Sequence, residues 1–193
     1  MKLAYSLTLL FFVSSFAMAQ ALPFSQIPEA PKQLTPSSAL LRMVQGLGFR
    51  YYWATEGLRK EDLDYRPSWE ASSSLETLQH LYGLSKTIAE AVQNIPSKRP
   101  DAKAPVTLES LRAETLTYLE QAAQVLSQAD QESLERMKIV FDREGKQSAF
   151  PLWNLINGPI SDALYHTGQV VSFRRTSGNP IAKGVNVFLG IKN

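Results

Sequence analysis

A carboxylate, an imidazole and an amide stand at helical spacing between Asp162 and Gln169. Asp162 and His166 are four residues apart, so on a helix they share one face and can close on one ion. Gln169 lies one turn further along, and the row is apolar at both ends, at Leu155 and Phe173. Because polar groups in an apolar row need partners, this spacing predicts a metal site.

The chain has two histidines, and the other one, His80, lies beside the apolar stripe of an earlier helical segment. An ion held by His80, Asp162 and His166 has three protein ligands, which leaves a position for water or substrate, as catalytic sites do. A simpler alternative needs no metal. In that case His80 is a half-buried histidine with satisfied hydrogen bonds, and Asp162 and His166 are an ordinary polar pair.

Other residues near these three have competing interpretations. Glu76 lies four residues before His80 as a possible fourth ligand, but Ser73 to Glu76 matches a capping box, and we therefore favour one ion over two. Gln169 is the catalytic candidate, since it can orient a ligand or a bound water. Arg174 and Arg175 either contact an anionic substrate or complement the dipole at the helix end.

Composition limits the class of protein. The 193 residues are 44% hydrophobic, enough for one domain with a substantial core. The formal net charge is +2 with the signs interspersed, which argues against a nucleic-acid partner. The chain has no cysteine, so disulfides, thiolate ligands and a cysteine nucleophile are excluded. A metal site must therefore use histidine and carboxylate ligands.

The N-terminus is typical of a secretory signal peptide. Lys2 precedes an apolar stretch over residues 3–16, and Ala17-Met18-Ala19 is a small-x-small cleavage site, so residues 1–19 form the predicted signal. The stretch is shorter than the ~20 residues that span a bilayer, so we expect no stable membrane insertion after its removal. Residues 20–34 contain three prolines and read as an extended linker. The expected location is periplasmic or secreted.

The remaining residues, 35–193, are expected to form one all-α domain. Thr35 with Pro36, Ser73 with Glu76, and Thr107 mark helix starts, and apolar residues then repeat at helical spacing. The predicted helices cover residues 36–59, 74–95, 108–126 and 150–175, with loops between them. They predict an antiparallel four-helix bundle whose long loops permit a non-sequential arrangement.

Several segments remain less regular. The cluster at residues 51–53, Tyr-Tyr-Trp, lines a pocket, forms a dimer interface or, more commonly, packs in the core. Residues 137–145 alternate and predict a short extended or hairpin segment before the last helix. Pro159 must either kink that helix or begin a new one capped by Asn157. The C-terminal tail after Gly178 is expected to lie over the bundle.

Two motifs make the chain resemble the DinB-like (DinB/YfiT) superfamily of metal-binding four-helix bundles. The first is residues 63–67, LDYRP, followed by residues 74–81, SLETLQHL, and the second is residues 162–169, DALYHTGQ. The resemblance implies that His80 and His166 occupy the first and third metal-histidine positions. Asp162 stands where the family most often has histidine, and Thr167 where it often has arginine. The implied ion is divalent zinc, nickel or iron, and a set of two histidines and one carboxylate also suits iron.

The family resemblance implies a broad range of functions, because the superfamily includes thiol-dependent transferases and isomerases as well as hydrolases assigned by inference. Export favours metal-assisted hydrolysis of a small-molecule substrate, since thiol cofactors belong chiefly to the reducing cytosol. The base would be a carboxylate, Tyr165 or the metal-bound hydroxide itself. The alternatives are a non-catalytic metal- or ligand-binding bundle and a thiol-dependent transferase. A homodimer would be ordinary for the resembling family.

Overall fold

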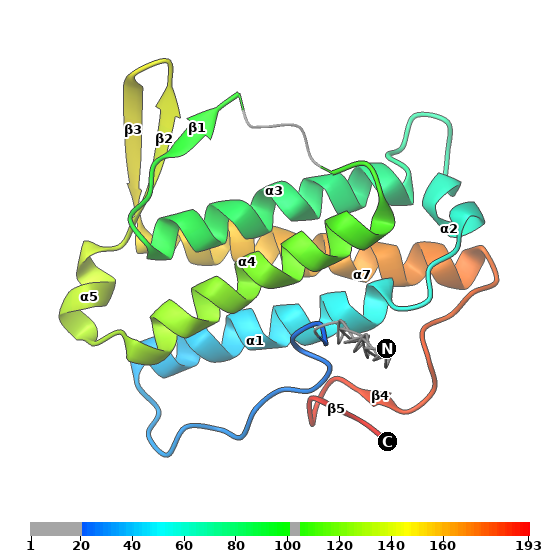
Figure 1. Cartoon of the computed structure of the whole chain (residues 1–193), viewed down its shortest axis with the longest axis horizontal. Coiled ribbons are helices and arrows are strands. Elements are labelled where there is room, and N and C mark those ends of the chain that lie inside the picture. Colours follow the sequence, from blue (N-terminus) through cyan, green and yellow to red (C-terminus); the bar gives the residue numbers. More distant parts are fainter. Residues whose placement is uncertain (1–20, 101–104) are drawn as a thin grey trace, which may run out of the picture.

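The computed structural model describes residues 21–100 and 105–193, and the predicted signal peptide, residues 1–19, lies outside them. The fold is mostly helical (Figure 1). Four helices in these ranges are 16 residues or longer: α1 (Pro36–Thr55), α3 (Ser74–Val92), α4 (Leu108–Gln128) and α7 (Ser161–Thr176). No helix in the described ranges combines the length and apolarity that a membrane span requires.

Each long helix packs against two others. α4 contacts α1 and α3, and α7 contacts the same two helices from the other side. The direction of the helices differs from the antiparallel prediction, because α1 runs parallel to α7 and α3 runs parallel to α4 (Figure 1). The reason is the 15-residue connection from Gln93 to Thr107, which is long enough to return along the whole of α3 before α4 begins.

The predicted helix starts are confirmed. The Thr35 hydroxyl accepts a hydrogen bond from the Ser38 amide at 3.2 Å, with Pro36 at the first helical position. Ser73 and Glu76 form the reciprocal capping box, and Thr107 caps α4. These side chains take up backbone donors that a helix start otherwise leaves unpaired. They also fix where α3 begins, and so which of its faces carries His80.

The apolar stripes of the long helices meet in one core. It includes Val44 and Leu47 of α1, Leu78 and Leu81 of α3, Leu116 and Leu119 of α4, and Ala163 and Val170 of α7. On α7 the buried residues Ala163, Thr167, Val170 and Arg174 follow helical spacing. The predicted polar row lies one residue before each of them, at Asp162, His166, Gln169 and Phe173. The row therefore runs along the boundary between the core and solvent.

Short elements depart from the sequence prediction in two places. The first helix ends at Thr55 and not near Arg59, because Gly57 takes a positive φ of 68°. The loop expected over residues 60–72 contains a short helix, α2 (Lys60–Asp64). A further helix, α5 (Gln131–Arg136), is capped by the side chain of Asp130.

The expected hairpin before the last helix is confirmed as β2 (Lys138–Arg143) and β3 (Lys146–Pro151), which pair antiparallel. A third strand, β1 (Ser97–Arg99), pairs parallel with β2 and was not predicted. It has only three residues, too few to show a period of two. The Arg99 guanidinium lies 5.2 Å from the centre of the Phe141 ring on β2, which helps to hold the strand in place.

The last helical segment is kinked directly before Pro159, and the kink separates two helices. α6 (Leu152–Leu155) continues into a π-helical turn, η1 (Ile156–Ile160), and then into α7. The kink falls at Gly158, whose φ of −96° and ψ of −105° are not helical. Because the irregularity ends at Ile160, Asp162 and His166 lie on one regular helix, as predicted.

Residues 21–28, predicted to be part of a linker, contact α1. Phe24 packs on Gly48, where a Cβ atom would lie within 2.6 Å of the ring. The Trp53 indole donates a hydrogen bond to the Ser25 carbonyl at 3.1 Å, and the Ile27 amide donates to Gly190 at 2.8 Å. Gly190 belongs to the C-terminal tail, which pairs β4 (Val185–Asn186) with β5 (Ile191–Lys192) and lies against this segment.

A buried network of hydrogen bonds closes the C-terminal end of α7. Asp62 of α2 is fully buried, and its Oδ1 accepts hydrogen bonds from Arg59 Nη2 at 2.9 Å and from the Ser177 hydroxyl. Its Oδ2 accepts from the Asn179 amide at 2.6 Å and from Arg59 Nε at 3.0 Å. The Arg59 side chain, Ser177 and Asn179 together hold the pKa of Asp62 well below its usual range, against the opposing effect of burial.

Arg174 completes this end of the molecule. Its side chain is buried, and Nη1 donates to the carbonyls of Ala54 and Glu56 at 2.9 Å each. Nε donates to the Asn179 carbonyl at 2.6 Å. Arg174 therefore satisfies carbonyl groups that the end of α1 leaves unpaired. Its role is to join α1 to α7, and it contacts no residue of the predicted metal site.

Candidate metal centre

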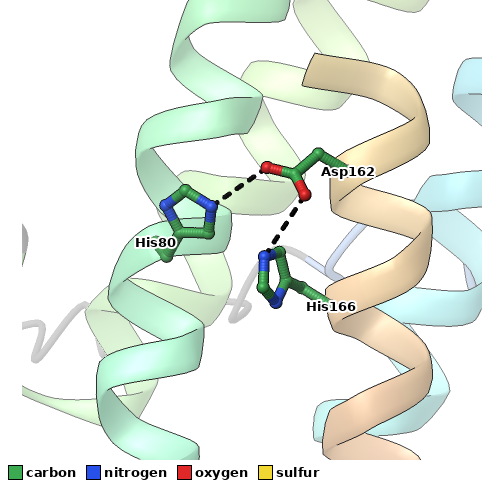
Figure 2. A group of neighbouring side chains, drawn as sticks. All are labelled: His80, Asp162 and His166. Carbon is green, nitrogen blue, oxygen red and sulfur yellow. Dashed lines mark hydrogen bonds and ion pairs between the residues drawn. The ribbon is translucent and has the colours of Figure 1, made fainter. Parts of the chain in front are cut away.

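His80 of α3 faces Asp162 and His166 of α7, although 82 residues separate it from Asp162 in the sequence. The three side chains point toward one another across the gap between the two helices (Figure 2). Two features of the fold bring them together: α3 and α7 pack against each other, and the polar row of α7 runs beside its buried stripe. The sequence prediction that these three residues share one site is consistent with this arrangement.

Asp162 lies between the two imidazole rings. Its Oδ2 is 3.1 Å from His80 Nε2, and its Oδ1 is 3.3 Å from His166 Nε2. The rings of His80 and His166 are nearly perpendicular, with centres 4.7 Å apart. One ligand atom from each of the three residues lies within 4.8 Å of the other two, a spacing at which the group could hold a metal ion.

These distances can be compared with those of a bound ion. Ligand atoms about 2.0–2.1 Å from a tetrahedral zinc are ~3.3 Å from one another. The two contacts of Asp162 are already 3.1 Å and 3.3 Å. This spacing is compatible with a divalent cation held by the three side chains, and the carboxylate would contribute one negative charge toward it.

The group is accessible to solvent. The side chains of His80 and Asp162 are 49% and 42% exposed, while that of His166 is 23% exposed. A cavity of about 320 Å³ adjoins the two histidines. Its other walls come from Glu76 and Thr77 of α3, from Gln169 and Phe173 of α7, and from the segment between α2 and α3, at Pro67, Ala71 and Ser72. A small molecule can therefore reach the candidate ligands from one side.

Gln169 contacts His166 directly. Its Oε1 lies 2.7 Å from His166 Nδ1, which leaves His166 Nε2 directed at Asp162. If Nδ1 carries the proton and donates it to Gln169, Nε2 presents a lone pair toward the centre of the group. Gln169 Nε2 in turn donates to the Tyr165 hydroxyl at 3.4 Å. The geometry suits Gln169 to orienting the His166 ring.

Glu76 contacts Ser73 and Arg66 and is not one of the three grouped residues. Its Oε2 accepts a hydrogen bond from the Ser73 amide at 2.7 Å and lies 3.1 Å from Arg66 Nη2. The Ser73 amide, followed by the Ser73 hydroxyl, lowers the pKa of Glu76, so it stays ionised in this role. Glu76 acts as a helix cap through Oε2. This geometry supports three protein ligands over four.

Residues 65–72 form one wall of the cavity, and this wall was not predicted from the sequence. Ser74 N donates to the Tyr65 carbonyl at 2.9 Å, and Arg66 Nη1 donates to the Ala71 carbonyl at 2.6 Å, which folds the segment over the site. Tyr65 also contacts Phe173 of the polar row, with ring centres 5.7 Å apart. The Arg-Pro turn at residues 66–67 was visible, but the direction in which it folds depends on contacts with α7.

Comparison with known proteins supports the fold. No protein-family model matches the chain, and no curated protein matches it. Among solved structures, the chain is similar to the crystal structure of a DinB-like protein, YjoA, from Bacillus subtilis. The TM-score is 0.55 and the sequence identity is 17%, over 72% of this chain and 92% of that one. The fold is therefore DinB-like, as the two sequence motifs predicted.

Proposed function

We propose that this protein is an exported, divalent-metal-binding DinB-like four-helix bundle that hydrolyses a small-molecule substrate. His80, Asp162 and His166 are the proposed ligands, and zinc, nickel or iron is the proposed ion. The observation that carries this proposal is the convergence of the three side chains beside a solvent-reachable cavity. The fold of the similar DinB-like protein is consistent with it.

The accessible side of the group favours catalysis over a purely structural ion. A structural site is normally closed by four protein ligands, whereas a catalytic one keeps a position open. Glu76, the nearest further carboxylate on α3, is held by Ser73 and Arg66 and does not close the group. When bound, a divalent ion would acidify a water molecule and polarise the substrate.

The protein's own residues supply orientation and shape. Gln169 holds His166 through Nδ1 and is in contact with Tyr165, whose side chain is 64% exposed. Tyr165 is thus the group best placed to exchange a proton with solvent beside the site. Phe173 and Pro67 provide apolar surface in the cavity for the non-reacting part of a substrate.

The test is a hydrolase screen on untagged protein loaded separately with zinc, nickel or iron(II). Esters, amides, lactones and phosphoesters are offered as substrates. We expect turnover with one ion, reduced about 100-fold or more in His166→Ala and unchanged in Thr176→Ala, an exposed position on the same helix. Turnover that requires an added thiol would favour the transferase alternative, and metal binding without turnover would favour a non-catalytic binding protein.

Export and oligomeric state are separate parts of the proposal. Export predicts that protein recovered outside the cytosol lacks residues 1–19, so its measured mass corresponds to a chain that begins at Gln20. An intact mass for the full 193 residues would contradict cleavage. A homodimer, expected from the resemblance, would appear by sedimentation as twice the chain mass.

A further inference from the structure

The opposite face of α7 borders a second cavity, of about 720 Å³, which lies between α1, α7 and the C-terminal tail. Thr167 and Gly168 line it, directly after His166 in the sequence, but they point away from the metal group because one residue turns a helix by about 100°. The cavity is therefore separate from the candidate metal centre, although both use the same helix.

Three arginines line this cavity, and no carboxylate does. Arg42 and Arg50 come from α1 and Arg175 from α7. None of the three forms an ion pair with a residue of the described part of the chain. Other arginines in these ranges do have carboxylate partners, including Arg59, Arg66 and Arg112. The cavity therefore concentrates positive charge that the described residues leave unneutralised.

Two of the three arginines donate a hydrogen bond to a backbone carbonyl, which leaves part of each guanidinium unused. Arg50 Nη1 donates to the Gly46 carbonyl at 3.0 Å, and Arg42 Nη1 donates to the Pro28 carbonyl at 2.9 Å. A guanidinium has five N–H donors, so each retains others. Arg175 lies at the C-terminal end of α7, whose partial negative charge favours a cation but does not replace a counter-ion.

The space between the arginines is open and partly apolar. A Cβ atom at Gly168 would have no neighbour within 4 Å, so this glycine leaves room on the α7 side. Gly168 therefore borders free space in the cavity. Apolar side chains form much of the remaining wall: Met43, Leu164, Val171, Ile181 and Val187.

These features define the chemistry of a ligand. A guanidinium pairs with a carboxylate or phosphate through two parallel hydrogen bonds. Apolar walls accept a hydrocarbon group, and the volume lies within the range of small-molecule sites. We propose that this cavity binds a small organic oxyanion with an apolar body, whose charged end is held by Arg50 and Arg175. This site is independent of the proposed metal centre.

Calorimetric titration with octanoate, octyl phosphate, inorganic phosphate and 1-octanol tests the proposal on the whole purified protein. We expect saturable binding at one site per chain for octanoate or octyl phosphate. Binding should be about tenfold weaker or more in Arg50→Gln and in Arg175→Gln, because each loses a charge-assisted hydrogen bond. Arg136→Gln, at an exposed arginine of α5, is the matched control and should bind as the wild type does.

A second variant distinguishes loss of binding from loss of folding. Gly168→Leu fills the cavity from the α7 side, and it should weaken binding while thermal unfolding and metal content stay as in the wild type. Failure of both octyl anions to bind would overturn the proposal, as would equal affinity in the arginine variants. Equal binding of 1-octanol would also contradict it, since the arginines would then contribute nothing.

Discussion

Two polar clusters join α7 to its neighbours, and they differ in how many acceptor positions of their carboxylate are occupied by hydrogen bonds. At the C-terminal end, Asp62 is fully buried and accepts hydrogen bonds from Arg59, Ser177 and Asn179. In the N-terminal half, Asp162 is 42% exposed, and each of its oxygens contacts one histidine nitrogen. Both carboxylates have partners, but only Asp162 retains acceptor capacity in a place that solvent can reach.

Because of this difference, we expect the Asp62 cluster to contribute to stability and the His80, Asp162 and His166 group to contribute to binding. A buried carboxylate with all its acceptors used has nothing left to offer a ligand, so the Asp62 cluster serves to fasten α2 and α7 together. The His80, Asp162 and His166 group offers three ligand atoms that lie within 4.8 Å of one another beside a cavity. Substitutions in the two clusters should therefore affect different measurements.

The largest expected effect on stability comes from Asp62→Ala. Removing this carboxylate leaves the Ser177 hydroxyl and the Asn179 amide without their buried acceptor. We expect the free energy of unfolding to fall by about 3 kcal/mol, measured by urea denaturation. Asp64→Ala, at an exposed position of the same short helix, is the control and should change it by less than about 0.5 kcal/mol. Similar losses in the two variants would contradict a fastening role for Asp62.

Acid should weaken the same cluster. The pKa of Asp62 is lowered in the folded protein, so the unfolded chain binds its proton at a higher pH than the folded one. Its contribution is complete above the unfolded pKa of about 4 and is lost as the pH falls toward the lower folded value. The stability of the wild type should therefore fall below about pH 5 by up to ~1.4 kcal/mol per pH unit for this group. Denaturation of Asp62→Asn over the same range should show a shallower slope, and an equal slope would contradict the assignment.

A smaller effect is expected from Gln169→Ala at the other cluster. Loss of the contact with His166 Nδ1 frees the ring to rotate, which should weaken metal binding about tenfold while stability stays nearly unchanged. Competition with a chelator of known affinity measures the change. Glu76→Gln is the matched control, since Glu76 lines the same cavity but serves as a cap, and its metal affinity should equal that of the wild type. A tenfold loss in that variant would indicate a fourth ligand.

Local signals made much of the helical framework predictable. Thr35, Ser73 and Thr107 are caps whose effect is confined to the next turn, so their neighbours in the sequence suffice to identify them. Grouping His80 with Asp162 and His166 was also possible from the sequence, because Asp162 and His166 share a helix face and His80 is the only other histidine. That it lies opposite them follows from the packing of α3 on α7.

The structural features that were not predicted from the sequence depend on contacts between residues far apart in the chain. Asn179 reaches Asp62 across 117 positions, and nothing near either residue in the sequence signals that pair. The strand β1 depends on pairing with β2, and the parallel course of α1 and α7 depends on how the connection between α3 and α4 returns. The unpaired charge of Arg175 was likewise hidden, since the sequence does not show which residues of other elements lie opposite it.

The central claim is that the His80, Asp162 and His166 group binds one divalent ion and that the Asp62 cluster binds none. Metal content per chain, measured by mass spectrometry on untagged protein after equilibration with zinc, nickel or iron(II), tests it most directly. We expect about one equivalent in the wild type and in Asp62→Asn, and less than about 0.1 equivalent in His80→Ala and His166→Ala. Less than 0.1 equivalent in the wild type, unchanged by His166→Ala, would contradict the account.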